Sequence, residues 1–392
     1  MSGQFTQRGK GHLVNLRPAS YGFLSSSPPT ACGLATFTTA LGSALARQGA
    51  DVRVVRVLDS PEDRVTSSLR VIGELIASDP TSIDRAADAL NGCDVALIQH
   101  EYGLFGGRDG SDVLEVLDRL RVPAVAILHT VLPHPTDHQV EVLNEVIRSA
   151  DCVVVMTSAA EATLRNVNDV GETPVSVIPH GAAVTRSKEC RLKSARPVLL
   201  TWGLIGPGKG IQWVIDAMKN LRDIDPAPLY VVAGRTHPKV FAHEGDSYRQ
   251  SLVKRVVDNG VEGMVHFDNS YRDLPSLKAL IESADVVVLP YDSLDQATSG
   301  VLVDAVAAGR PVIATAFPHA KELLNTGAGI VVAHGDVSAL SRAIRRVITE
   351  ADVASAMAVE ARRIAPTLGW DAVGFQYRKL TNRLLQRVGV GA

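Results

Sequence analysis

The sequence is poor in cysteine, has no long apolar run and carries almost no net charge. Its 392 residues include four cysteines, none of them in a C-x-x-C pair, which argues against a zinc site and a disulfide framework. The net charge of −2 gives no overall positive field, so we expect no nucleic-acid partner, while a peripheral membrane contact stays open. No apolar run approaches the ~18 residues of a membrane span, and we see no signal-peptide pattern. We therefore expect a cytoplasmic protein with reduced thiols.

The length and the apolar content favour two α/β domains. A single core rarely grows beyond ~250–300 residues, and an apolar share of 46% is ample for two cores. Short β-branched runs alternate with helical stretches, a pattern typical of βαβ units and of parallel sheets buried on both faces. The strands predicted in the first half are His12–Leu16, Asp51–Val57, Val95–Gln99, Ala124–Leu128, Cys152–Met156 and Val175–Ile178.

The same pattern starts again in the second half, which predicts a second doubly wound, Rossmann-like domain. Its predicted strands are Val198–Trp202, Leu229–Ala233, Val265–Phe267, Val286–Leu289, Val312–Ala314 and Gly329–Val332. We expect domains over residues 1–182 and 197–369, a linker over 183–196, and a helix over 370–392 that packs back on the first domain. The helical tail is predicted to break at Pro366 and Gly369. Ligands of such folds bind at the carboxyl ends of the strands, so the cleft between the domains is the expected site.

Two clusters in the first half follow predicted strands. Gly33 lies in a loop that opens a helix, where backbone N–H groups could approach a phosphate; a plain capped loop is an equal alternative. His100, Glu101 and Tyr102 follow the third strand and precede several glycines, which favours a pocket wall over an exposed loop.

A histidine-rich stretch ends the next strand. His129 stands where the sheet presents side chains to a cleft, and His134 and His138 follow closely. Intervening prolines break the helix that a metal-binding pair would need, so we expect no metal here. The stretch Ile178–Gly181 could line the cleft or merely turn the chain into the linker.

Two clusters in the second half suit a phosphorylated ligand. The loop Trp202–Gly210 combines glycines with Lys209 at a helix start, which offers backbone donors, a positive helix end and a point charge. The stretch Thr298–Gly300 reads as a helix cap with open amides, and Asp304 lies deeper in that helix, where it could grip ribose hydroxyls. The bland alternatives are a glycine-rich turn and an ordinary exposed acid.

Together these motifs resemble the retaining family 4 glycosyltransferases, whose fold is the two-domain GT-B type. Trp202–Gly210 is similar to the family's Gly-Arg-x4-Lys-Gly phosphate loop, and Gln296–Pro311 to its segment with two glutamates. Ile178–Gly181 resembles the segment before its domain linker, and the resemblance extends from His12 to about Trp370. A mannosyl- and glucosyl-transferring subgroup is more closely similar at Gln99–Gly107, Leu128–Leu132, Thr236–Pro238 and Gln296–Gly300.

The resemblance implies a hexose transfer from a nucleotide-sugar such as GDP-mannose or UDP-glucose to an unidentified sugar, lipid or small-molecule acceptor. Transfer would retain the anomeric configuration and need neither a metal nor a further cofactor. Leu204 replaces the arginine of the phosphate loop, and Arg235 is the candidate to compensate for it; Gln296 and Asp304 replace the two glutamates.

By the same resemblance, His129 and Lys209 would act at the reacting centre, and His100, Glu101 and Tyr102 would line the acceptor pocket. The donor would bind to Gly33, Gly203, Lys209, Arg235, Gln296, Ser299, Gly300, Val301 and Asp304. A nucleotide-sugar epimerase of the same fold and a non-catalytic sugar-nucleotide binding protein are the alternatives.

Overall fold

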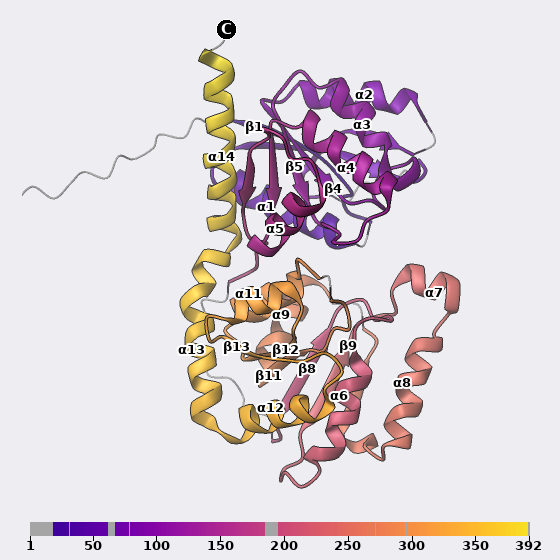
Figure 1. Cartoon of the computed structure of the whole chain (residues 1–392), viewed down its shortest axis with the longest axis vertical. Coiled ribbons are helices and arrows are strands. Elements are labelled where there is room, and N and C mark those ends of the chain that lie inside the picture. Colours follow the sequence, from indigo (N-terminus) through magenta and orange to yellow (C-terminus); the bar gives the residue numbers. More distant parts are fainter. Residues whose placement is uncertain are drawn as a thin grey trace, which may run out of the picture.

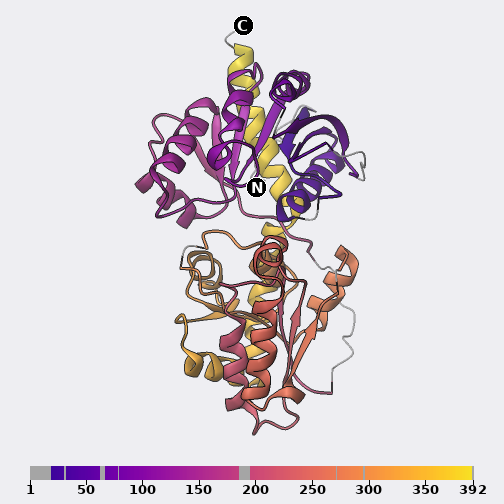
Figure 2. The ribbon, with the colours of Figure 1, turned by 90° about the vertical axis from the view of Figure 1, so that its right-hand side faces the viewer.

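The computed structural model describes residues 19–390 except 31, 62–66, 78, 185–194, 271 and 295, and leaves the side chains of 239 and 388–390 undescribed. These residues form two lobes, one above the other, joined along one side by a long pair of helices (Figures 1 and 2). The predicted strand His12–Leu16 lies outside the described residues. No helix in the described ranges is both long and apolar enough to cross a membrane.

The N-terminal lobe is a parallel sheet in the order β3-β2-β1-β4-β5-β6-β7 with helices on both faces. Its central strands β4, β5 and β6 are mostly runs of Val, Ile, Leu and Ala, as expected for a sheet covered on both sides. The strands are β1 Ser20–Ser25, β2 Asp51–Leu58, β3 Arg70–Ile76, β4 Val95–His100, β5 Ala124–Leu128, β6 Cys152–Val155 and β7 Val175–Val177. The helices are α1 Gly33–Arg47, α2 Thr81–Asn91, η1 Arg108–Gly110, α3 Asp112–Asp118, α4 Asp137–Ser149 and α5 Ser158–Val167.

The C-terminal lobe repeats this design with the strand order β10-β9-β8-β11-β12-β13, again all parallel. Its strands are β8 Val198–Trp202, β9 Leu229–Ala233, β10 Val265–Asp268, β11 Val286–Leu289, β12 Val312–Thr315 and β13 Gly329–Val332. Its helices are α6 Ile211–Met218, η2 Lys219–Leu221, α7 Pro238–Glu244, α8 Ser247–Asp258, η3 Glu262–Met264, α9 Leu274–Ser283, α10 Gly300–Ala307, α11 Pro318–Leu324 and α12 Val337–Thr349. The predicted α/β class with two doubly wound Rossmann-like domains is confirmed.

The helical tail differs from its prediction at one point. Pro366 does not interrupt the helix but lies inside α13 (Ala351–Leu368). The buried face of α13 includes Ala361, Ile364 and Leu368. The burial of this apolar face outweighs the hydrogen bond that a proline removes near the end of a helix. The helix ends at Leu368, and Gly369 alone separates it from α14 (Trp370–Val390).

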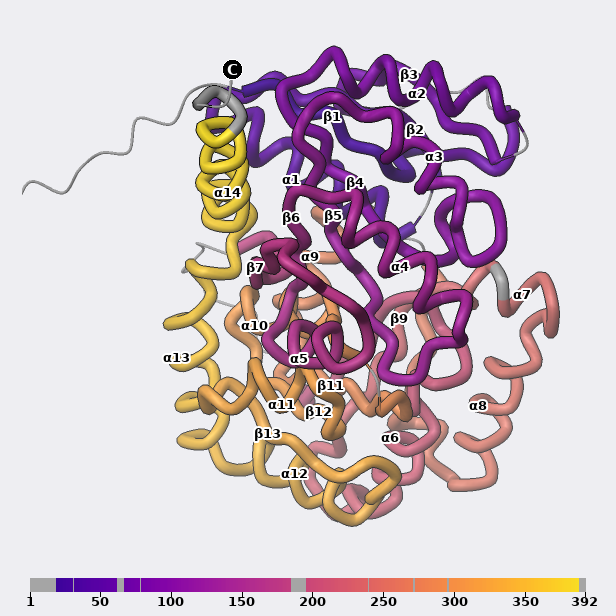
Figure 3. Tube along the Cα trace, turned by 45° about the horizontal axis from the view of Figure 1, so that its top comes forward, coloured from indigo at the N-terminus to yellow at the C-terminus, as the bar shows by residue number. Residues whose placement is uncertain are grey.

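Two chain crossings connect the lobes and run side by side. The Ala182 N–H donates to Leu368 O (2.8 Å), and the Trp370 N–H donates to Ala182 O (3.2 Å). Beyond this point α14 returns to the N-terminal lobe and packs along α1, as Figure 3 shows from above. Its residues Val373, Tyr377, Leu380 and Leu384 enter the core of that lobe. The crossings therefore form the joint about which the lobes meet.

Candidate active site

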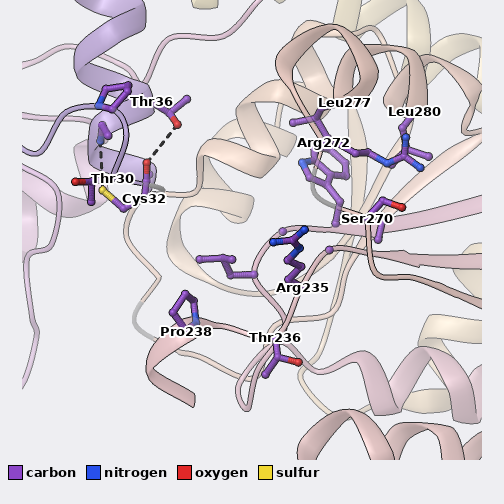
Figure 4. A pocket seen from close by; sticks show the side chains of 18 of the residues that line it. Thr30, Cys32, Thr36, Arg235, Thr236, Pro238, Ser270, Arg272, Leu277 and Leu280 are labelled. Carbon is purple, nitrogen blue, oxygen red and sulfur yellow. Dashed lines mark hydrogen bonds between the residues drawn. The ribbon is translucent and has the colours of Figure 1, made fainter. Parts of the chain in front are cut away.

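Two adjoining cavities lie between the lobes, at the carboxyl ends of both sheets. The smaller one, of about 400 Å³, has Thr30, Cys32 and Thr36 of the N-terminal lobe on one side. Arg235, Ser270 and Arg272 of the C-terminal lobe face them across it (Figure 4). The larger one, of about 1000 Å³, runs from α1 past α9 to Trp370 near the joint. This is where folds of this kind bind their ligands.

The amino end of α1 forms the wall of both cavities on the N-terminal side. Cys32 caps this helix, because its Sγ accepts the Ala35 N–H (3.4 Å). Gly33 lines both cavities, and a Cβ built on it would meet nothing within 4 Å. Its backbone is thus open to a ligand, with the positive end of a helix dipole behind it.

His129 lines the larger cavity and is held from behind by Gln99. Its Nε2–H donates to Gln99 Oε1, and its backbone N–H donates to His100 O (3.1 Å). Burial, helped by the nearby His180 and His100, lowers the pKa of His129 to about 3. The imidazole is therefore neutral at physiological pH, with Nδ1 left as its hydrogen-bond acceptor.

His100 at the end of β4 and the two residues that follow it do not lie together on the cavity wall. Glu101 lines the larger cavity and accepts a hydrogen bond from Thr130 Oγ1 (2.5 Å). His100 is fully buried, and burial lowers its pKa to about 4. Tyr102 lies edge-on to His100 with 5.2 Å between the ring centres, and neither residue lines either of the two cavities. The expected pocket wall is reduced here to Glu101, because alternate residues of a strand end point to opposite faces.

Two loops of the C-terminal lobe pack tightly against each other beside the smaller cavity. Gly203 and Gly234 both have positive φ, and a Cβ on Gly234 would lie 1.9 Å from Gly203 O, so only glycine fits there. Beyond them, Ile205 pairs with Thr236 in an isolated parallel bridge. This pairing places Leu204 and Arg235 on neighbouring segments of the same cavity wall.

Lys209 is half-buried, in contrast to the exposed lysine that a helix start suggests. Its Nζ lies 4.6 Å from the centre of the Tyr291 ring, and desolvation lowers its pKa. Within the described ranges its ammonium has no hydrogen-bond acceptor, and it does not line either cavity. The loop reaches this position because Gly210 has φ +63° and passes so close to Pro290 O that a Cβ would lie 1.7 Å from it.

The amino end of α10 carries both used and unused backbone donors. Ser299 accepts the Leu302 N–H with its side chain (3.3 Å), and its own N–H is already donated to His319 Nδ1 (2.8 Å). In the part of the chain that the structure describes, the N–H groups of Gly300 and Val301 have no acceptor, and both residues line the larger cavity. The open amides predicted at this helix are therefore those of Gly300 and Val301, without that of Ser299.

Gln296 and Asp304, which stand where the family has two glutamates, differ in what their side chains face. The Gln296 side-chain amide donates to Thr298 O of its own loop, and Gln296 lines neither cavity. Asp304 lines the larger cavity, and burial raises the pKa of its carboxyl to about 7. No described residue donates a hydrogen bond to this carboxyl. A desolvated acid without a partner, turned to a cavity, is suited to hydroxyl groups of a ligand.

Three aromatic side chains meet at the cleft. One of them, His180, belongs to the stretch Ile178–Gly181, for which the sequence allowed either a cleft wall or a turn into the linker, and its place in the larger cavity favours the cleft wall. Phe37 and Trp370 were not singled out by the sequence and are found only in the structure. The His180 ring lies in the larger cavity, against Gly300 of the opposite lobe and within 5.1 Å, centre to centre, of the Phe37 ring. Trp370 continues this aromatic cluster, again 5.1 Å from Phe37. Among the described residues, no group of three or more His, Cys, Asp or Glu side chains is placed to hold a metal ion.

Comparison with known proteins agrees with this division into lobes. Residues 31–186 match the family model described as Glycosyltransferase Family 4, and residues 196–350 match the model described as Glycosyl transferases group 1. The lipopolysaccharide glucosyltransferase WaaG of Escherichia coli is 28% identical over 193 residues, which are 48% of this chain and 47% of that protein. A GDP-mannose-dependent phosphatidylinositol monomannoside mannosyltransferase of Mycolicibacterium smegmatis is 28% identical over 216 residues, 53% of this chain and 52% of that protein. The chain spans about half the length of the curated relatives that it matches.

Solved structures show the same fold over nearly the whole chain. Sucrose-phosphate synthase from Thermosynechococcus elongatus superposes with a TM-score of 0.74 at 20% identity, covering 95% of this chain and 100% of that one. Anabaena HepE in complex with UDP-glucose superposes with a TM-score of 0.70 at 18% identity, with the same coverage of 95% and 100%. With a family model on each lobe, the chain belongs to the family 4-type glycosyltransferases with the GT-B fold.

Proposed function

We propose that this family 4-type glycosyltransferase transfers a hexose from a nucleotide-sugar of the UDP-glucose or GDP-mannose type to an acceptor hydroxyl. Transfer retains the anomeric configuration and uses neither a metal nor a further cofactor. The observation that carries the proposal is the half-buried Lys209 ammonium, which has no hydrogen-bond acceptor among the described residues. A desolvated cation of this kind is suited to an anionic ligand.

The donor diphosphate is expected between the open ends of α1 and α10. Lys209 lies on the Tyr291 ring, and the Tyr291 hydroxyl hydrogen-bonds the Ser299 side chain directly before Gly300. The ammonium and the free amides of Gly300 and Val301 therefore belong to one neighbourhood. Gly33 offers its open backbone from the other lobe, so both helix dipoles favour the negative charge.

The nucleoside is assigned to the C-terminal side of the cleft. Asp304 would accept hydrogen bonds from the ribose hydroxyls, which supply the partners that its carboxyl lacks. The base would enter the smaller cavity, where Arg235, Ser270 and Arg272 offer polar groups beside the apolar Leu277. Leu204 on the same wall contributes no charge, so the outer phosphate is assigned to Arg235 on the neighbouring segment.

The transfer step needs stabilisation of a departing diphosphate more than it needs a base. The acceptor oxygen forms a bond to the anomeric carbon from the face of the leaving group, while the bond from that carbon to the phosphate oxygen breaks. The acceptor proton passes to the departing phosphate oxygen. Preorganised donors aimed at the growing negative charge are the main source of rate for such a step, and Lys209 with the two amides supplies them.

His129 is assigned to the sugar rather than to proton transfer. Its pKa is lowered to about 3, and its Nε2–H is donated to Gln99. The neutral ring would therefore accept a hydrogen bond from a sugar hydroxyl at Nδ1. Glu101 lies on the same cavity and is assigned to the acceptor side. The buried His100 and the half-buried Tyr102 contact each other, line neither cavity and are assigned no direct contact with the acceptor.

Two measurements test the proposal in sequence. UDP-glucose and GDP-mannose are first screened for thermal stabilisation of the protein, since a ligand that binds only the folded state raises the melting temperature. Release of UDP or GDP is then followed with and without a panel of sugar and lipid acceptors. Stabilisation by neither nucleotide-sugar would overturn the donor assignment. Stabilisation without turnover on any acceptor would favour a non-catalytic binding protein, an alternative that the inward-turned Gln296 amide supports.

A further inference from the structure

A carboxylate of the C-terminal lobe caps a helix of the N-terminal lobe. Glu322 on α11 accepts the Ser158 N–H with Oε1 (3.0 Å) and the Ala159 N–H with Oε2 (3.0 Å). These are the first two amides of α5, which lies against α11 where the lobes meet (Figures 1 and 3). Amides in the first turn of a helix have no partner within it, and an anion there is favoured by the helix dipole.

Two hydrogen bonds connect the same contact region to the loop before α10. Thr157, the N-cap of α5, donates its hydroxyl to Ala297 O across the cleft (2.9 Å). His319, one turn before Glu322 on α11, accepts the Ser299 N–H (2.8 Å). The loop that presents the Gly300 and Val301 amides is therefore tied to the N-terminal lobe directly through Ala297 and indirectly through α11.

We infer that Glu322 is a positioning residue that holds the lobes closed and thereby sets the loop before α10. The inference rests on the proposed function for its effect on turnover, but the contact itself does not depend on it. Glu322 is exposed and lines neither cavity, so we assign it no contact with the donor or the acceptor. It acts only when the lobes are together, because its two partners belong to the opposite lobe.

The effect on catalysis follows from the closed population. A protein that is closed for a smaller fraction of the time binds its ligand less tightly by that fraction. Couplings of this type typically change affinity 5–150-fold, and we expect the low end for an exposed carboxylate. Glu322→Ala should therefore raise the KM for the donor about five- to tenfold, while kcat at saturating donor changes less. Glu322→Gln, which keeps one acceptor oxygen but no charge, should fall between.

The partner amides allow a sharp second variant. Ser158 is the first residue of α5 after its N-cap, a position where proline is well tolerated because the N–H has no partner within the helix. Thr157 is extended (φ −147°, ψ 155°), as a residue before proline prefers, so Ser158→Pro keeps the helix and removes one of the two donors. Lys321→Ala is the matched control, since Lys321 is an exposed neighbour on α11.

The experiment measures closure apart from turnover. Small-angle scattering of the full chain gives the radius of gyration with and without UDP-glucose or GDP-mannose, and melting temperatures check folding. We expect a larger radius and a higher donor KM for Glu322→Ala and Ser158→Pro, with no further change in the double variant. An unchanged radius and KM in Glu322→Ala, or fully additive effects in the double variant, would overturn the inference. If the radius grows while no protein, wild type included, turns over, the lobe contact stands and the proposed transferase activity fails.

Discussion

The Lys209 ammonium lies 4.6 Å from the centre of the Tyr291 ring, which in turn stacks on Phe317 with 5.2 Å between the ring centres. The ring face attracts the cation but does not occupy its three N–H donors. Tyr291 thus holds the lysine in place without neutralising it. This arrangement gives a fixed, half-desolvated positive charge beside the start of α10.

Removal of that charge should affect the transition state most. Negative charge on the diphosphate grows as the glycosidic bond breaks, so we expect Lys209→Ala to lower kcat/KM by on the order of 10²–10³, as the loss of one oxyanion donor does. Lys209→Arg should recover only part of the rate, since a planar fork does not reproduce a compact ammonium on the Tyr291 ring. The measurement is nucleotide release with the donor that the thermal screen selects.

The control for this prediction is Lys219→Ala, an exposed lysine that directly follows α6. It should leave both turnover and the melting temperature unchanged. Lys209→Ala should also melt close to the wild type, because loss of the ring contact is offset by relief of the desolvated charge. Normal turnover in Lys209→Ala would mean that the diphosphate binds elsewhere.

The ionisation of Asp304 should control donor affinity. Burial raises the pKa of its carboxyl to about 7. Only the ionised carboxylate can accept hydrogen bonds from two ribose hydroxyls with both of its oxygens. Between pH 8 and pH 6 the ionised fraction falls about tenfold, so donor affinity should fall by a similar factor. Titration calorimetry at several pH values measures this directly. In Asp304→Asn the pH dependence should vanish, and affinity at pH 8 should drop by ~1.5–3 kcal/mol.

The raised pKa of Asp304 also predicts how the stability of the ligand-free protein depends on pH. Stability should fall as the pH rises, whereas donor affinity should increase. Its pKa in the folded chain, about 7, is above the ordinary value of 3.8, so the folded state binds the proton more tightly than the unfolded state. This contribution to stability is present at low pH and is lost as the pH rises through 7. Ligand-free Asp304→Asn should therefore melt higher than the wild type at pH 8, with a difference that shrinks toward pH 4. A lower melting temperature for the variant at pH 8 would contradict the burial argument.

Most strands of the C-terminal lobe were predictable because they are short apolar runs. β8, β9, β11 and β12 are largely buried, while β10 and β13 are half-buried edge strands. β8, β9, β11 and β13 begin and end at the predicted residues. In the N-terminal lobe the predictions omitted β1 and β3. β1 contains Gly22, which suits a site where Leu90 and Cys93 pack against the backbone, and β3 is a half-buried edge strand interrupted by Gly73 and Glu74. Neither has the apolar run that marks a central strand.

The site was less accessible to sequence reasoning, because its properties depend on distant contacts. A glycine-lysine turn signals a loop but not that Lys209 lies on Tyr291, a residue at the end of a different strand. The Gln296 amide could be turned to the ligand or to its own loop, and only the tertiary structure decides this. Glu322 and Thr157 have no motif at all, since their roles arise only when the lobes meet.

Turnover should not depend on a divalent metal. In the described ranges no cluster of acidic or histidine side chains is placed to hold one, and in the proposed mechanism Lys209 with the Gly300 and Val301 amides would stabilise the departing diphosphate instead. Nucleotide release in excess EDTA should equal that in the untreated enzyme, with the melting temperature as a check on folding. A complete loss that added magnesium or manganese restores would refute the mechanism.

The contact between Gly300 and His180 should limit the size of the side chain that the first residue of α10 can have. A Cβ on Gly300 would lie 3.0 Å from both Cε1 and Nε2 of His180, a ring that belongs to the opposite lobe. Gly300→Ala leaves the backbone N–H in place but obliges the lobes to separate slightly or the ring to move. Since the ring is also packed against Phe37 and Trp370, we expect separation, and therefore a higher donor KM with an unchanged melting temperature.

A second substitution separates the steric effect on lobe closure from an effect of Gly300→Ala on the α10 amides themselves. His180→Ala removes the ring and should impair the enzyme on its own, because it opens a gap beside Phe37. In the double variant the new methyl group has room, so the Gly300→Ala substitution should add little to the loss caused by His180→Ala. The donor KM of the four proteins gives this coupling directly, since contacting residues depart from additivity. Additive effects would mean that Gly300→Ala acts on the α10 amides themselves and that closure does not depend on the small size of this residue.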